Sequence, residues 1–373
     1  MINASTVSRS NRLRRGSFAA FGYVLVFLLF WTAIPVILRQ EPPGDNLEQL
    51  NWALHPALGY AKHPPLPTWA LWLFEQFAPA GLPLTYLLGA LEVLLTMALA
   101  RQLGTATMDA RRGWLGALLI TCISYHTLRM HFYNHNTALL CANAAAMLCA
   151  WKAAQGRKNA QWTVLGVCWA AGMLCKYQMA VPIFCNLTFL AVALRHEPRQ
   201  LLRGAALSGV VCAVLLTPHI VWLVQNHFPT FDYAATSLDA VLPFAARWNG
   251  LLHFLASQAL RLLPALLLIC MLHIQSRRAP RVDDNVSTQH PHATLFWTIH
   301  ALGPLVLMSL MGGIAGVDLQ MHWGTAFLWA LPMWYLSTRH GMRLMRLPRA
   351  QMLAMIITVQ SVLMTGKIVF PDL

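Results

Sequence analysis

Charged residues are scarce in this chain of 373 residues. Asp, Glu, Lys and Arg together make up 11% of it, whereas 57% is hydrophobic. A soluble domain carries about 25% charged residues, so the composition excludes a soluble globular protein and indicates an integral membrane protein. The length leaves no room for a large soluble domain beside the membrane spans. We therefore predict a single transmembrane domain over residues 1–373, without a C-terminal soluble domain.

Paired cysteines and standard zinc signatures are also lacking. The eight cysteines all fall in apolar stretches and no two form a CxxC pair, which excludes a disulfide framework. They are typical of small buried hydrophobic residues. Three histidines, His126, His131 and His135, crowd one segment, but their H-x4-H-x3-H spacing matches no standard zinc signature.

Acids are few as well: 13 Asp and Glu stand against 27 Lys and Arg, which gives a net charge of +14. In a soluble protein this balance would suggest a nucleic-acid partner. Here the cations are scattered through short loops between apolar runs, so membrane topology explains them better. We expect no nucleic-acid partner.

Long apolar runs are abundant, and a span needs about 20 such residues. The sequence predicts an all-α bundle of about eleven spans. They lie near residues 18–38, 82–102, 113–128, 134–151, 161–175, 177–194, 205–224, 251–274, 293–312, 324–338 and 350–367. The break at Lys176-Tyr177 is also compatible with a re-entrant turn.

The distribution of Lys and Arg predicts the orientation. If the N-terminus is cytoplasmic, 20 of the 27 cations fall on the cytoplasmic side. The remaining seven are Arg39, Lys62, Arg129, Lys176, Arg247, Arg261 and Lys367. We therefore predict a bacterial inner-membrane protein with its C-terminus and its first loop on the periplasmic side.

The first outer loop, GDNLEQLNWALHPALGYAKHPPLPTW (residues 44–69), holds an unusual concentration of polar chemistry. Its segment LEQLNWALH predicts a short helix lying on the membrane surface. Asp45 stands near the start of that helix, where the helix dipole and free N–H groups favour an acid. The segment PLPTWALWLFEQF predicts a second interfacial helix, because its tryptophans suit the headgroup zone.

These motifs resemble the membrane-embedded GT-C glycosyltransferases, in the branch of the protein O-mannosyltransferases and lipid A aminoarabinose transferases. The matching residues are Asp45, Trp52, Gly59-Tyr60 and His63-Pro64-Pro65. Residues 132–140, 165–182, 222–234 and 321–332 also resemble that branch, in the same order along the chain. The sequence departs from the pattern at two positions: Asn46 replaces the second acid of an Asp-Glu pair, and Lys62 stands where an acid is often found.

The resemblance implies a GT-C fold and transfer of a sugar from a polyprenyl-phosphate donor to a lipid, glycan or protein of the envelope. It implies that the loops over residues 39–81 and 225–250 form the active-site face. Asp45 is the candidate catalytic base, although a simple helix N-cap is the alternative. Glu48 lies one turn later on the same face and is either part of the site or an exposed surface acid.

The donor phosphate requires positive charge, because the leaving group gains negative charge. The candidate substrate-binding residues besides Glu48 are Tyr60, Lys62, His63, Arg129, Lys176 and His227. Lys176 is also compatible with snorkelling to the headgroups, and Arg129 with binding an anionic membrane lipid.

A divalent metal is possible, but none is expected to be essential. Relatives that bind a metal do so partly through the acid that Lys62 replaces, and a protonated lysine cannot be a ligand. If an ion binds, the resemblance points to Asp45, His63 and His227.

Two other classes remain open. A transporter or lipid flippase would use Glu92, near the middle of the second span, with Arg261 as a possible partner. However, the chain shows none of the internal repeats that transporters usually carry. A catalytically inactive relative that acts as a scaffold is the third class, because Asn46 and Lys62 replace acids.

Overall fold

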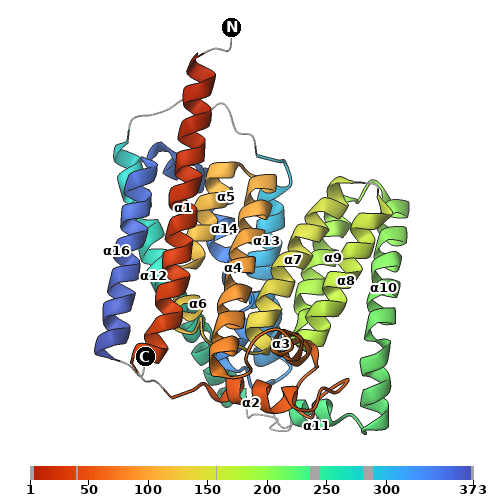
Figure 1. Ribbon diagram of the computed structural model, residues 1–373. Helices are drawn as coiled ribbons and strands as arrows, with labels where there is room; N and C mark the ends of the chain where they lie inside the picture. Colours follow the sequence, from red (N-terminus) through yellow and green to blue (C-terminus); the bar gives the residue numbers. More distant parts are fainter. Residues whose placement is uncertain (1–3, 39–40, 157, 236–243, 280–288, 371–373) are drawn as a thin grey trace.

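The chain folds into a bundle of helices that run roughly alongside one another (Figure 1). The computed structural model describes residues 4–38, 41–156, 158–235, 244–279 and 289–370. Those residues contain helices, turns and loops and no strand, so the all-α prediction is confirmed.

The helices follow one another in a simple order along the chain. They are α1 (Ala4–Ile37), α2 (Gly44–Ala53), α3 (Leu66–Glu75), α4 (Leu82–Thr107), α5 (Ala110–Ile120), α6 (Ser124–Leu128), α7 (His135–Gln155), α8 (Asn159–Cys175), η1 (Tyr177–Met179), α9 (Ala180–Ala193), α10 (Pro198–Gln225), α11 (Pro229–Ala235), α12 (Phe244–Arg278), α13 (Ala293–Gly313), η2 (Met321–Gly324), α14 (Ala330–Ser337), α15 (Arg339–Arg343), η3 (Leu344–Arg346) and α16 (Arg349–Val369).

Within the described residues, six helices are long and apolar enough to cross a membrane: α4, α7, α10, α12, α13 and α16. Shorter apolar helices cover Phe21–Ile37 and Tyr177–Ala193. Two of the eleven predicted runs are not continuous helices. Residues 113–128 are divided between α5 and α6, and residues 324–338 contain only the short α14. The chain is an integral membrane protein, and the number of its spans stays a prediction.

Most helices pack against helices that lie near them in the sequence. α7 packs against α4 and α8, and α8 packs against α10, while α13 contacts α9, α12 and α14 (Figure 1). Gly89 in α4 permits one close approach that matters for the site. A Cβ there would lie 2.8 Å from the carbonyl oxygens of Met130 and Phe132, so only glycine lets this loop cross the helix.

The short helices α2, α3 and α11 gather at one end of the bundle, opposite the end at which α1 begins (Figure 1). The two helices predicted in the first loop therefore exist, as α2 and α3. α11 brings part of the predicted loop over residues 225–250 to the same end. Residues 39–40 and 236–243 of the two predicted loops lie outside the described residues.

Candidate active site

Helix α2 has two polar faces with different surroundings. Asn46 and Gln49 are fully buried against the bundle, whereas Asp45 and Glu48 line a cavity. The N-cap of α2 is Pro43, so Asp45 sits inside the first turn and the N-cap interpretation of its role is wrong. The helix dipole still favours a carboxylate at this position.

Asn46 fastens α2 to the bundle. Its Nδ2 donates to Thr85 Oγ1 at 2.8 Å and to the carbonyl oxygen of His131 at 2.9 Å. Its Oδ1 accepts from the backbone N–H of Tyr133 at 3.1 Å. An amide supplies the two donors and the acceptor that these partners need, and a carboxylate would not.

Gln49 continues this attachment one turn later. Its Oε1 accepts from Thr68 Oγ1 of α3 at 2.8 Å, and its Nε2 lies 3.3 Å from Nδ1 of His135. The other ring nitrogen of His135 lies 3.2 Å from the carbonyl oxygen of Pro64. The inner face of α2 therefore fixes both α3 and the Pro64-Pro65 turn relative to α7.

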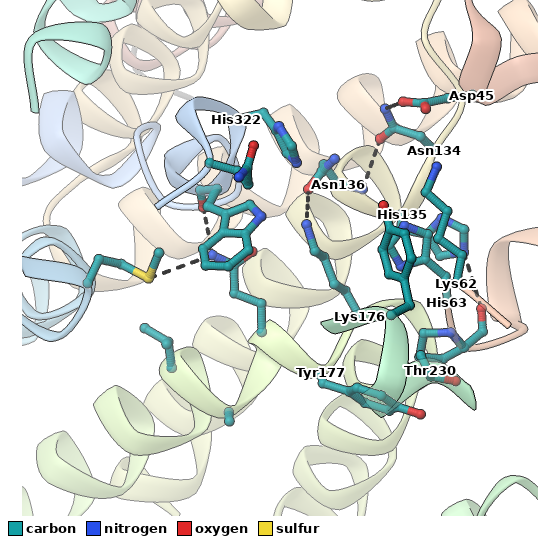
Figure 2. Close-up of a pocket in the computed structure, with 18 of the residues that line it drawn as sticks. Asp45, Lys62, His63, Asn134, His135, Asn136, Lys176, Tyr177, Thr230 and His322 are labelled. Atoms are coloured by element: carbon teal, nitrogen blue, oxygen red, sulfur yellow. Dashed lines mark hydrogen bonds between the residues drawn. The ribbon is translucent and has the colours of Figure 1, made fainter. Parts of the chain in front are cut away.

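A cavity of about 650 Å³ opens beside these helices. Its walls come from α2, the Pro64 turn, α6, the start of α7, η1, the start of α9, α11, the end of α13 and the segment around η2. Figure 2 shows most of the side chains that line it. Its polar lining residues are Asp45, Glu48, Lys62, His63, Tyr125, Arg129, Asn134, His135, Asn136, Lys176, Tyr177, Gln178, Thr230, Tyr233, Gln320, His322 and Trp323. A volume of this size is typical of a small-molecule site.

Two asparagines connect Asp45 with Lys176 along the wall of the cavity (Figure 2). Asn134 Nδ2 donates to Asp45 Oδ2 at 2.8 Å, and Lys176 Nζ donates to Asn136 Oδ1 at 2.7 Å. Asn134 is itself the N-cap of α7, where its Oδ1 accepts from the N–H groups of Asn136 and Thr137. The rigid start of α7 therefore positions both the carboxylate and the ammonium group.

Lys176 occupies the break between α8 and η1, in extended backbone conformation. Its side chain is half-buried, with Nζ 5.8 Å from the centre of the Trp323 ring. Burial lowers the pKa of Lys176 to about 7, although the nearby Asp45 carboxylate opposes this effect. An added anion would stabilise the charged form.

Glu48 and Lys62, which line the same cavity, form an ion pair. Lys62 Nζ lies 3.2 Å from both carboxylate oxygens of Glu48. Burial alone would lower the pKa of Lys62, but the Glu48 carboxylate outweighs it and the pKa is raised. The ammonium group also lies 5.8 Å from the centre of the Tyr233 ring.

The histidines that face the cavity are uncharged at neutral pH. Burial, together with the nearby charge of Lys176, lowers the pKa of both His63 and His322 to about 3. The rings of His63 and His135 lie 4.1 Å apart. These side chains offer hydrogen bonds and stacking surfaces rather than charge.

Arg129 supplies the third cation of the cavity. Its exposed guanidinium lies 5.0 Å from the centre of the Phe132 ring and 5.7 Å from that of Tyr125. The two ion pairs found among the described residues are Glu48–Lys62 and Asp109–Arg112, so neither involves Arg129. Its charge is available to a ligand anion.

The structure gathers most of the predicted site residues into one place. Six line the cavity: Asp45, Glu48, Lys62, His63, Arg129 and Lys176. Tyr60 does not line it and is stacked on Trp52, with ring centres 4.7 Å apart. His227 is exposed in the turn after α10, with φ of 59°, and does not line the cavity. The functional roles of these residues stay predictions.

The residues present do not fit a divalent metal ion. The suggested set of Asp45, His63 and His227 is not brought together, because His227 lies outside the cavity. Over the described ranges, no three His, Cys, Asp or Glu side chains form a metal-binding group. His63 instead faces Lys62 and Lys176, whose charges oppose a nearby cation.

Sequence reasoning missed several lining residues, notably Asn134, Asn136, Gln178 and His322. Asn134 carried a detectable signal, because Asn at the start of an apolar run is typical of a helix N-cap. Gln178 donates from Nε2 to the carbonyl oxygen of Trp323 at 2.9 Å, which joins η1 to η2. No spacing rule connects these two segments in the sequence.

Glu92, the residue on which the transporter hypothesis depends, lies in α4 and outside the cavity lining. One of its carboxyl oxygens is buried without a hydrogen-bond partner. Arg261 is not its ion-pair partner: the guanidinium of Arg261 donates to the carbonyl oxygen of Met321 and lies 5.3 Å from the centre of the Tyr125 ring.

Known proteins resemble the chain in fold and in part of its sequence. Residues 62–222 match the family model of dolichyl-phosphate-mannose-protein mannosyltransferases. The structure of ArnT from Cupriavidus metallidurans bound to undecaprenyl phosphate superposes with a TM-score of 0.67 at 17% identity, over 94% of this chain and 66% of that one. The apo structure gives 0.59 at 16% identity, over 95% and 66%. No curated protein sequence matches the chain significantly.

The chain shares the fold of the two ArnT structures, and its polar cavity lies at one end of the helical bundle. With the family model over residues 62–222, this likeness in fold supports the resemblance to GT-C glycosyltransferases that the motifs indicated. The chain spans about two thirds of the length of the solved structures that it matches.

Proposed function

We propose that the protein transfers a sugar from a polyprenyl phosphate to an acceptor on the periplasmic face of the bacterial inner membrane. The observation that carries this proposal is the cavity in which the Asp45 carboxylate and the Lys176 ammonium group are connected through Asn134 and Asn136. The undecaprenyl phosphate bound to the similar ArnT structure supports a polyprenyl-linked donor.

The reaction needs a base and a cation in one enclosed place. Asp45 would take the proton of the acceptor hydroxyl while the acceptor oxygen attacks C1 of the sugar. The bond between C1 and the phosphate oxygen breaks, and its electron pair stays on the phosphate. Lys176 and Arg129 would stabilise the resulting charge. No step requires a metal.

The size of the cavity fits a sugar phosphate rather than a complete lipid donor. A volume of about 650 Å³ holds a sugar, its phosphate and the reacting group of an acceptor. The long prenyl chain would remain in the bilayer. The acceptor is a lipid, a glycan or a protein of the envelope, and it would meet the sugar next to Asp45.

The test is the Asp45→Asn variant, which keeps the size of the side chain and removes its basicity. We expect transfer to fall about 10²- to 10⁴-fold with unchanged expression. Transfer would be followed by mass spectrometry of envelope lipids, glycans and proteins with and without the protein. Asp232→Asn is the matched control, because Asp232 is exposed on α11 outside the cavity lining.

The same assay separates an enzyme from a transporter. A transporter that depends on Glu92 would be disabled by Glu92→Gln and would tolerate Asp45→Asn. The proposed glycosyltransferase would respond in the opposite way. Normal modification of the acceptor in the Asp45→Asn strain would refute the role of Asp45 as base.

A further inference from the structure

The Glu48–Lys62 ion pair lies at the surface of the cavity and is open to a ligand. The side chains of Lys62 and Glu48 keep 32% and 27% of their accessible surface, so both can make further contacts. The two residues come from different segments, α2 and the turn before Pro64-Pro65, which α3 and α7 hold in place. The pair is therefore a fixed feature of the site.

Such a pair presents hydrogen-bond donors and acceptors side by side. The Lys62 ammonium has three N–H donors, and the Glu48 carboxylate has about four lone-pair positions. Their mutual contact leaves some of each unused. Neighbouring hydroxyl groups of a sugar both donate and accept, so they match this arrangement. The Tyr233 ring beside Lys62 adds an apolar surface for the carbon face of a sugar.

The charges around the cavity limit which sugar fits. The cavity-lining carboxylates of the described chain are Asp45 and Glu48, and the side chains that can carry positive charge are Lys62, Arg129 and Lys176. Asp318 is exposed beyond this lining. A bound phosphodiester would neutralise the excess cation. An ammonium group on the sugar would then find Glu48 already paired and Asp45 needed as the base, so it would remain uncompensated.

We propose that the Glu48–Lys62 pair binds neighbouring hydroxyl groups of an uncharged sugar and disfavours a sugar that carries an ammonium group. This inference rests on the proposed function, because it assigns the sugar that the donor carries. Glu48 and Lys62 are specificity-determining residues in this scheme. The phosphate and the reacting atoms lie with Lys176, Arg129 and Asp45.

The experiment measures binding of three probes to the purified full-length protein in nanodiscs. The probes are undecaprenyl phosphate, undecaprenyl-phosphate glucose and undecaprenyl-phosphate aminoarabinose. We expect the glucose lipid to bind about tenfold more tightly than bare undecaprenyl phosphate, because hydrogen bonds to charged groups contribute about that much to affinity. The aminoarabinose lipid should bind no more tightly than the bare lipid phosphate. Tighter binding of the aminoarabinose lipid by the wild type would overturn the proposal.

Variants of the two residues should change the preference in different directions. Lys62→Gln frees the Glu48 carboxylate, so the aminoarabinose lipid should gain about tenfold relative to the glucose lipid. The Glu48→Gln variant should bind the glucose lipid no more tightly than bare undecaprenyl phosphate, and its affinity for the aminoarabinose lipid should not increase. Each ratio is measured on one sample, so partial misfolding does not affect it. Lys158→Gln, at an exposed position outside the cavity, is the matched control and should keep the wild-type ratio.

The result also separates a failure of the proposed function from a failure of the inference about the Glu48–Lys62 pair. If the bare undecaprenyl phosphate fails to bind, the proposed function is wrong and the sugar preference falls with it. If the lipid phosphate binds and the ratio is the same in wild type and Lys62→Gln, the proposed function stands and the inference about the ion pair is overturned.

Discussion

Replacing Asn46 with Asp should destabilise the fold, although relatives carry an acid at this position of their motif. Asn46 is fully buried, and its Nδ2 donates to Thr85 Oγ1 and to the His131 carbonyl oxygen. An ionised Asp at this position would place an oxygen against both acceptors. A protonated Asp would restore only one of the two donors.

The loss of folding stability caused by Asn46→Asp depends on pH, because the buried site disfavours the ionised form of the new acid. Near pH 4 the acid is largely protonated and one hydrogen bond is lost, which costs about 1–2 kcal/mol. Near pH 7, keeping an acid of ordinary pKa protonated adds about 4 kcal/mol. The pKa of the new acid is raised in the folded state, so the unfolded state loses its proton first. Stability of the variant therefore falls as pH rises from about 4 towards neutral.

Thermal unfolding in detergent, read by intrinsic fluorescence, measures this effect. We expect the unfolding temperature to fall by about 10 °C near neutral pH and by about 3 °C near pH 4, relative to wild type at each pH. Asn159→Asp is the control, because Asn159 is exposed in the first turn of α8, where the helix dipole tolerates an acid, and its substitution should change little. An Asn46→Asp protein as stable as wild type at neutral pH would refute the assigned hydrogen-bond network.

Two further predictions concern the charge of Lys176 and a metal ion. Binding of undecaprenyl phosphate should weaken as pH rises from about 6 to about 9, because Lys176 is positively charged below its pKa of about 7. The Lys176→Gln variant should bind about tenfold more weakly near pH 6 and should lose most of this pH dependence. If its pH profile equals that of the wild type, Lys176 does not contact the phosphate. EDTA should leave sugar transfer by the purified protein unchanged, and a loss that added Zn²⁺ or Mg²⁺ restores would show that a metal site exists.

The sequence predicts the membrane character, the all-α fold and the two helices of the first loop, because hydropathy and local helix signals carry that information. It does not predict helix continuity: residues 113–128 are apolar enough for a span, but a turn at residues 121–123 divides them into two helices. The charged members of the site could be predicted because the predicted topology leaves only seven of the 27 Lys and Arg residues on the outer side. Asn136 and His322 could not, because a polar residue acquires a role only through the fold that brings distant segments together.

The division of α2 into two faces gives Asn46 and Lys62, the two departures from the family motif, separate explanations. Asn46 points away from the cavity and holds the helix, so it is not a catalytic acid lost from the site. Lys62 lines the cavity and pairs with Glu48, which adds an organised group to the site rather than removing one. The hypothesis of an inactive scaffold assumed that Asn46 and Lys62 both remove acids that catalysis needs. Asp45, the one acid that the proposed chemistry requires, is present and lines the cavity.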